Sequence, residues 1–518
     1  MHRRILLLTV LAVFVGGLPL SSASSAVAQT TAGQPSGAET DSTVAERLVR
    51  EALSNNLSLK QERIALDQRR AALDQTRGQY LPSLTLQARY SRARGGRTID
   101  FPVGDLINPA YRALEEQNPG QQFPTLDNRE FQLQRQTEQQ TTLQLRQPLF
   151  NPKILYGTRA QKHNVDAQTA AVGTRRRALA RDVQVAYFRY RKAQARVDIL
   201  TATRTRVREN LRTNKRLLAS AKVTKDAVHR AKVEVLDVRQ QLADAQSSVD
   251  QARRRLNMLR NRRATAPIPA PDTDVDALIA QRLHVVEQGL GRSLSRGEPI
   301  VAAAGEAGAM GSESVSAVSE RGTGTERTGW PLILTEERPM LDRLDAAAAA
   351  AEDRRRAAQT EFLPTVSLGV DAGIQGERYG FSGEKPFARA SLTLAWNLFD
   401  GFSDRSRVQR RELDVKRLRT RRAHVEQQMT LKAMKALEEV RVAQQSLETA
   451  DARVTAAQES FRLMRRRYDA GRAGQAELID ARTAFTRAEV NRTVTRYDLL
   501  IHLARLEHAA GLPLAGLR

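Results

Sequence analysis

A strand motif that occurs twice decides the fold of this sequence. The first copy reads YLPSLTLQARY at residues 80–90, and the second reads FLPTVSLGVDA at residues 362–372. Apolar and polar residues alternate in both copies, so that Leu84, Leu86 and Tyr90 share one face of an extended chain. A period of two over about ten residues is typical of a β-strand with one apolar face.

A second motif recurs downstream of each copy of the first. It reads TLQLRQPLF at residues 142–150 and SLTLAWNLF at residues 391–399. Four alternating segments of this length suit a membrane-spanning barrel, with apolar residues toward lipid and polar residues toward a wet lumen. The alternative is an amphipathic sheet in a soluble protein. The first copy carries about 33 extra residues between its two motifs, within 92–138, and their Gly, Pro, Asn and Gln content predicts a long surface loop.

The remaining sequence has the periodicity of long, packed helices. Apolar residues recur every seven positions, and mostly small residues follow three positions later: Val440, Leu447, Val454, Phe461 and Tyr468, then Ala443, Ala450, Ala457 and Met464. This heptad pattern predicts a helix–helix seam. The first half keeps the same register 250 residues earlier, and Arg204 is its one break. A continuous helix over 402–470 would be about 100 Å long, which no compact domain accommodates.

Each long helix is expected to end in a tight turn and to be followed by an antiparallel helix. The turns fall near 219–222 and 470–474, the second helices near 224–261 and 475–510, and Gly511 is a plausible stop. The expected organisation is a signal peptide at 1–28, a first repeat at 29–263 (strand hairpin about 81–150, helical hairpin about 152–262), a linker at 264–333 with a short helix near 276–289, and a second repeat at 334–518 (lead-in helix from about 334 to 358, strand hairpin about 363–399, helical hairpin about 402–511).

The first 28 residues predict export. Arg3 and Arg4 precede an apolar run over 5–15, and the Ala-Val-Ala sequence at 26–28 resembles a signal-peptidase site. A membrane anchor is the alternative, but the apolar run is short for a bilayer core of about 30 Å.

Composition excludes several classes of protein. The chain has 518 residues, a formal net charge of +24 and no cysteine. Disulfides, thiolate metal sites, cysteine nucleophiles and a lipidated N-terminal cysteine are therefore excluded. The positive charge would favour nucleic acid as a partner in the cytosol, but an exported chain does not meet it, so we expect none.

Taken in order, these motifs resemble the TolC-like outer membrane efflux proteins, the outer membrane factor family. The strand motifs, the sequence WNLFDG at 396–401, the sequence ERP at 337–339, and YDAG at 468–471 continued by ELIDAR at 477–482 carry the resemblance. It implies a mainly helical, internally duplicated chain with four barrel strands and long antiparallel coiled-coil hairpins, and a homotrimeric α/β-barrel channel-tunnel in the outer membrane with a large periplasmic part. It also implies efflux driven by an inner-membrane transporter through a periplasmic adaptor.

The resemblance also implies where function lies. Glu477 and Asp480 match acidic positions that narrow the periplasmic entrance in the family, although Ala473 replaces the basic partner expected beside them. Two ordinary acids paired with Arg472 or Arg482 are the alternative. The turns are expected to dock the adaptor: Ala219, Ser220, Ala221 and Lys222 in the first, and Ala470, Gly471 and Arg472 in the second. Trp396 is a candidate for an interfacial aromatic belt, or a plain packing residue of the barrel.

The sequence predicts no catalytic constellation, metal site or cofactor, so we expect a channel and no enzyme. The histidines are not spaced as metal ligands, since His502 and His508 lie on different helix faces. Two alternatives keep the architecture but change the cargo, to proteins of a type I secretion system or to metal ions. An alternative of another class is a basic coiled-coil protein that binds polyanions or acts as a scaffold.

Overall fold

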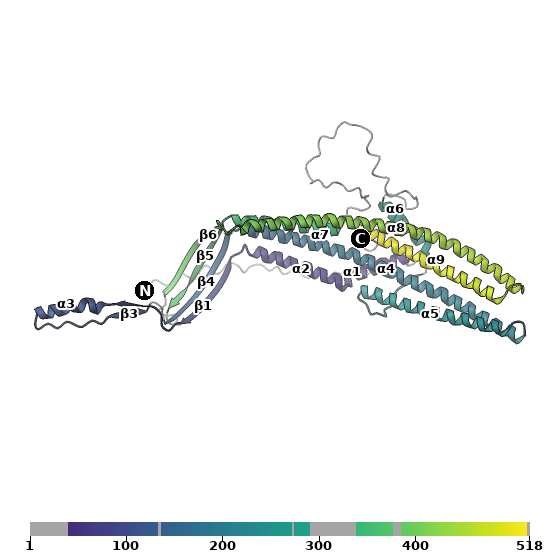
Figure 1. Cartoon of the computed structure of the whole chain (residues 1–518), viewed down its shortest axis with the longest axis horizontal. Helices are drawn as coiled ribbons and strands as arrows, with labels where there is room; N and C mark the ends of the chain where they lie inside the picture. Colours follow the sequence, from purple (N-terminus) through teal and green to yellow (C-terminus); the bar gives the residue numbers. More distant parts are fainter. Residues whose placement is uncertain (1–39, 133–135, 272–273, 291–337, 377–384, 515–518) are drawn as a thin grey trace, which may run out of the picture.

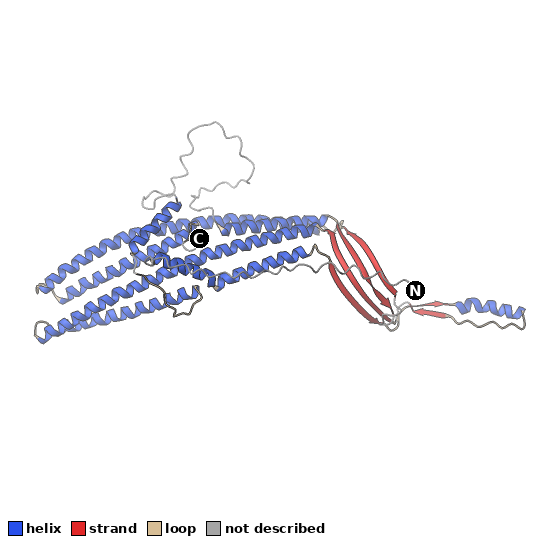
Figure 2. Ribbon diagram, turned by 180° about the vertical axis from the view of Figure 1, so that it is seen from behind, coloured by secondary structure: helices blue, strands red, loops and turns tan. Residues whose placement is uncertain are grey.

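The computed structural model describes residues 40–132, 136–271, 274–290, 338–376 and 385–514. Within these ranges the molecule is elongated, with long helices at one end, a sheet beyond them and a slender extension at the far end (Figures 1 and 2). The predicted signal peptide, the linker beyond residue 290 and the predicted start of the lead-in helix at 334–337 lie outside the described residues.

The four predicted strands form one antiparallel sheet. They are β1 (Ser83–Arg92), β4 (Thr137–Phe150), β5 (Thr365–Gly376) and β6 (Lys385–Ala395), in the order β1-β4-β5-β6. The two copies of the motif therefore meet at the β4–β5 pairing, where Leu145 lies opposite Val370. The outer strands β1 and β6 each pair along one edge only, so the sheet of one chain stays open.

The pairing register places apolar residues together on one face of the sheet. Two rows cross all four strands, Leu84–Leu145–Val370–Ala390 and Leu86–Leu143–Ala372–Ala388. Leu84 and Leu86 are 63% and 68% exposed in the single chain, so this face has no protein cover there. The opposite face is polar, since Arg389 donates to Asp371 at 2.9 Å and Arg89 donates to Gln140 at 3.0 Å.

The expected surface loop within 92–138 contains regular structure, and that expectation is corrected here. Strands β2 (Thr98–Phe101) and β3 (Arg129–Gln132) pair with each other, and helix α3 (Val103–Gln117) follows β2. The Asn128 side chain accepts from the backbone N–H of Gly104 at 3.0 Å. The Asn108 side chain donates to the backbone carbonyl of Leu126 and accepts from its N–H. Asparagine side chains therefore help to hold this segment in its fold, although the asparagine content of the sequence predicts a loop.

The predicted long helices are continuous. Helix α4 spans Pro152–Ala219 and α8 spans Ser403–Asp469, with 68 and 67 residues, which corresponds to about 100 Å each. The antiparallel helices α5 (Lys225–Leu259) and α9 (Gln475–Ala510) return beside them. Along α8 the predicted seam residues are buried or half-buried, and Phe461 stacks on Phe485 of α9 with ring centroids 5.9 Å apart.

Shorter helices complete the upper part of the layer. Helices α1 (Asp41–Asn55) and α2 (Leu57–Gly78) pack on α4, and α7 (Pro339–Gln359) lies between α4 and α8. A single 3₁₀ turn, η1 (Thr360–Phe362), leads from α7 to β5. Helix α7 fills the space between α4 and α8 on the side of the sheet, and α9 fills it on the side of the helix turns. The start of α7 therefore faces the end of α9 (Figure 1). Gly511 ends α9 with a φ of 81°, in the left-handed region that glycine favours.

The main core lies where these helix ends meet. It includes Tyr187, Phe188 and Leu437, which are fully buried, and residues of α6 (Val275–Leu290), the predicted short linker helix. Arg282 of α6 pairs with Glu507 of α9 at 3.3 Å, donates to Gln184 of α4 at 3.1 Å and lies over the Phe188 ring. The pair ties α6 to one face of α9 and α4.

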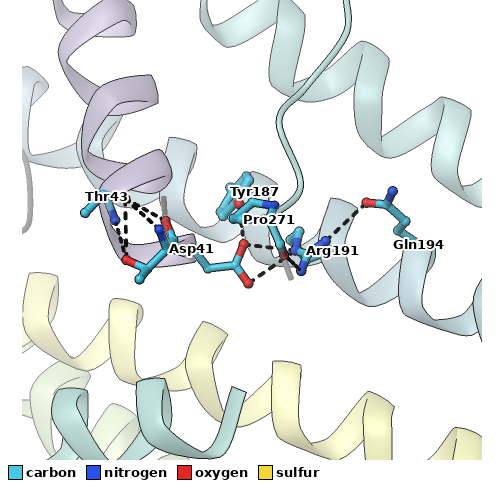
Figure 3. A network of polar contacts seen from close by, with 7 residues as sticks. Asp41, Thr43, Tyr187, Arg191, Gln194 and Pro271 are labelled. Atoms are coloured by element: carbon cyan, nitrogen blue, oxygen red, sulfur yellow. Dashed lines mark hydrogen bonds and ion pairs between the residues drawn. The ribbon is translucent and has the colours of Figure 1, made fainter. Parts of the chain in front are cut away.

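A buried polar network holds the N-terminal end of α1 in this core (Figure 3). The Asp41 carboxylate is fully buried, accepts from the Tyr187 hydroxyl and pairs with Arg191 at 2.9 Å. Arg191 also donates to the Pro271 carbonyl at 2.6 Å. Burial and the neighbouring Asp41 raise the pKa of Tyr187 well above its ordinary value, which keeps the hydroxyl a donor.

Among the described helices, none combines the length and apolar character required for a membrane crossing.

Candidate functional site at the helix turns

The two predicted turns lie side by side at the free end of the helical part (Figure 1). In the first, the N–H groups of Ala221 and Lys222 donate to the carbonyls of Leu218 and Leu217 at 2.9 and 2.8 Å. In the second, those of Gly471 and Arg472 donate to Tyr468 and Arg467 at 2.9 and 2.7 Å. Both are Schellman caps, related by the 250-residue offset that also relates the seams.

The two caps differ in the residue at the left-handed position. Gly471 adopts a φ of 71° and Ala221 a φ of 55°. A left-handed conformation costs an L-residue roughly 1–2 kcal/mol, which glycine avoids. The first turn therefore keeps the geometry of the second at a cost in stability. The other residues of the turns are exposed, namely Ala219, Ser220, Lys222, Ala470 and Arg472. The residues that follow them, Val223 and Ala473, are half-buried.

The two candidate entrance acids lie in the first turns of α9. Glu477 and Asp480 are three residues apart and both are exposed in the single chain. Neither makes an ion pair within the described residues, so the predicted alternative of pairing with Arg472 or Arg482 is not found there. Asp480 lines a groove of about 770 Å³ between α5 and α9, whereas Glu477 lies outside it.

Arg482 has another partner. It donates to both carboxylate oxygens of Glu234 on α5, at 2.9 and 2.6 Å, and each side chain is only 9% exposed. Burial raises the pKa of Glu234, and the Arg482 guanidinium opposes that rise. This pair joins the first helical hairpin to the second. It lies near Asp480, on the side of the turns that faces the sheet. Its members are 248 residues apart, and no spacing in the sequence indicated them together.

Positive charge also approaches Asp480 across the groove. Arg230 on α5 occupies the position of Asp480 in the first repeat, 250 residues earlier. It pairs with Asp226 at 2.7 Å, and that hydrogen bond, with a smaller contribution from Asp480, raises the pKa of Arg230. The repeat thus places opposite charges at equivalent positions on the two sides of the groove.

Trp396 lies far from the turns, directly after β6. Its indole N–H donates to the Phe362 carbonyl at 3.1 Å and its side chain is 56% exposed. The bond ties the end of the sheet to η1. Among the described residues there is no cluster of three or more His, Asp or Glu side chains that could hold a metal ion.

Comparisons with known proteins agree with this architecture. A family model described as "Outer membrane efflux protein" matches residues 48–262 and 330–512, one match for each repeat. No curated protein sequence matches the chain. Among solved structures, the chain is similar to the CmeC outer membrane channel of Campylobacter jejuni, with 16% identity, 97% of this chain and 95% of that chain covered, and a TM-score of 0.63.

Two further solved structures are similar over most of their length. CusC has 16% identity, coverage of 94% and 95%, and a TM-score of 0.66. The open state of the MtrE outer membrane channel of Neisseria gonorrhoeae has 17% identity, coverage of 91% and 90%, and a TM-score of 0.64. At these identities the likeness concerns the fold.

Proposed function

This chain belongs to the outer membrane efflux protein family, and from that premise we propose that it forms the channel-tunnel of a tripartite efflux system. The chain conducts cargo passively across the periplasm and the outer membrane, and an inner-membrane pump supplies the energy through a periplasmic adaptor. The observation that carries the proposal is the direct continuation of a sheet with one exposed apolar face into helices about 100 Å long.

A homotrimer is part of the proposal. The exposed apolar rows of the sheet suit contact with lipid, and the polar rows suit a wet lumen. The free edges of β1 and β6 would leave backbone groups unpaired in hydrocarbon, at a cost of several kcal/mol each. Other copies of the chain remove these edges by pairing β1 of one with β6 of the next. The family relationship supports three copies.

We place the entrance of the tunnel at the turns. Glu477 and Asp480 from three chains would surround one axis, where unpaired carboxylates attract hydrated cations. Neutralising both in a Glu477→Gln/Asp480→Asn variant should lower cation selectivity or raise leakage through the closed channel. A variant with the same charge change at exposed, unpaired positions, Asp244→Asn/Glu448→Gln, is the control. Equal conductance and selectivity in both variants would exclude the entrance role.

The adaptor is proposed to dock at the two Schellman turns. Small residues at Ala219 to Ala221 and at Ala470 and Gly471 leave room for a helix tip to approach the backbone. A Ser220→Trp substitution should weaken co-purification with the periplasmic adaptor, while leaving the trimer intact. Unchanged co-purification would argue against docking at the first turn.

The experiment that tests the function starts from the mature protein in detergent. We expect a trimer that resists dissociation on gels until it is heated, and stable conducting channels after insertion into planar bilayers. A basic coiled-coil scaffold would instead be monomeric or dimeric without detergent and would form no channels. The cargo alternatives, proteins or metal ions, are separated by the pump and adaptor that co-purify with the trimer.

A further inference from the structure

A strongly basic cavity lies where the end of α9 faces the start of α7. It has a volume of about 730 Å³ and is walled by α4, α7, α8 and α9. Eight arginine or lysine side chains line it, against two acidic ones. The volume suits a drug-sized organic molecule, since ligand pockets are typically about 300–1,000 Å³.

Both acids of this cavity are already engaged. Asp182 pairs with Arg181 at 2.7 Å, and Glu439 pairs with His502 at 3.1 Å. Five cations have no ion-pair or hydrogen-bond partner among the described residues: Arg189, Arg421, Lys432, Lys435 and Arg505. Four of them are exposed in the single chain and Arg505 is half-buried, so solvent and a dissolved ligand can reach their charges.

The pKa of His508, which also lines the cavity, is lowered by its burial and by the same positive charges. Its Nδ1 atom is buried without a hydrogen-bond partner in the described part of the chain. Burial, followed by the nearby Arg181 and Arg177 guanidinium groups, lowers its pKa to about 4. The ring therefore stays neutral at pH 7 beside the cations.

The cavity opens on the side of α9 that faces away from α6. Arg505 is two residues from Leu503 and two from Glu507, which is about 200° around an α-helix. Glu507 binds Arg282 of α6, so Arg505 lies on the opposite face. A tunnel that conducts cargo must stay clear, and a helix about 10–12 Å across from each of three chains would narrow it. On the proposed function, α6 therefore lies outside and the cavity opens to the lumen.

The walls between the cations are apolar. Val185 and Met429 line the cavity on α4 and α8, with Met340 on α7 and Ala509 on α9. A ligand that carries one or two negative groups on an apolar body can therefore match both the cations and the walls. Guanidinium and ammonium groups form their strongest hydrogen bonds with oxyanions such as sulfonate, phosphate and carboxylate.

We propose that this cavity binds amphiphilic organic oxyanions on their way through the tunnel, and that three such cavities form a basic belt that favours anionic cargo. The inference rests on the proposed channel function and adds the chemical class of cargo. The belt lies farther from the turns, toward the sheet, than the acidic entrance at Glu477 and Asp480. A cation-attracting entrance and an anion-binding wall therefore occupy different positions along one tunnel.

The test measures binding of 1-naphthalenesulfonate to the intact trimer in nanodiscs by calorimetry, with uncharged 1-naphthol for comparison. We expect the sulfonate to bind and a Lys432→Gln/Lys435→Gln variant to bind it about tenfold more weakly or worse, since one hydrogen bond to a charged group contributes about that factor. A Lys215→Gln/Lys232→Gln variant loses the same charge at exposed positions elsewhere and should keep the wild-type affinity.

Channel recordings separate this proposal from the function on which it rests. In a potassium chloride gradient, the Lys432→Gln/Lys435→Gln trimer should show a several-fold lower permeability ratio of chloride to potassium than the control variant. Channels that conduct normally but bind sulfonate and naphthol equally, or that respond alike to both pairs of substitutions, would overturn the anion site and leave the channel function standing. A protein that forms no channels but still binds the sulfonate through Lys432 and Lys435 would refute the channel function, and binding lost in neither variant would refute the site.

Discussion

Replacing Arg482 should separate the two helical hairpins near the entrance. In the native chain its guanidinium makes two hydrogen bonds to Glu234, at 2.6 and 2.9 Å, and both side chains are 9% exposed. An Arg482→Leu substitution leaves the Glu234 carboxylate buried without its partner. Removal of one member of such a buried pair costs about 3–5 kcal/mol. Local separation of α9 from α5 should then become on the order of 10²-fold to a few thousandfold more frequent, at about 1.4 kcal/mol per factor of ten.

Hydrogen exchange followed by mass spectrometry on the detergent-solubilised trimer measures this change directly. Amides in residues 475–490 of α9 and 225–240 of α5 should lose protection by that factor, while amides in the core near Leu500 keep theirs. The control is Arg230→Leu, which removes an exposed pair with Asp226 whose side chains are 55% and 66% exposed. Such a surface pair contributes at most about 1 kcal/mol, so exchange should change little.

A Glu234→Leu/Arg482→Leu variant completes the cycle. Two apolar side chains of this size often replace a buried ion pair without loss of stability, and we expect most of the lost protection to return. The reasoning is refuted if Arg482→Leu alters exchange no more than Arg230→Leu does, because the pair would then not hold the hairpins together. Protection that stays low in the double variant would show that packing around Arg482, and not the unpaired carboxylate, dominates.

Three further predictions concern stability, each read from thermal unfolding of the trimer followed by circular dichroism. Ala221→Gly should stabilise the first turn and Gly471→Ala should destabilise the second, each by about 1 kcal/mol, because only glycine tolerates the left-handed φ without strain; shifts of the same sign would refute this. Asp41→Ala should cost about 3–5 kcal/mol because it leaves Arg191 and the Tyr187 hydroxyl without their buried acceptor, and a loss below about 1 kcal/mol would contradict that. The folded-state pKa of His508, about 4, is below its ordinary value of 6.5, so the unfolded chain binds more protons between these pH values. Stability should therefore fall as pH drops from 6.5 toward 4, by about 1.4 kcal/mol per pH unit at most. A His508→Gln variant should lack this slope, and an equal slope in both proteins would assign it to other groups.

Local patterns were sufficient to predict most of the fold. The strand residues alternate with a period of two, and a one-residue slip would move Leu84 and Leu86 to the other face, so the pattern fixes both strand and face. The heptads fix the seam of α8 against α9 in the same way, since a helix buries the residues that recur along one side. The prediction of a loop within 92–138 was wrong because Asn128 accepts from the first N–H groups of α3 and Asn108 binds the backbone of Leu126, and composition does not distinguish such side chains from loop residues.

Sequence and tertiary structure thus determine different things in this protein. The sequence alone determines the four strands of the main sheet, the long helices and the turns between them, because each of these depends on a pattern of residues within a few turns of each other, and it shows directly that this unit occurs twice. The tertiary structure alone decides that Arg482 meets Glu234 and that Lys432 and Arg505 share a cavity, since these side chains come from helices far apart in the chain. Their energies depend on burial and on distance in space, and neither quantity is written in the spacing of residues.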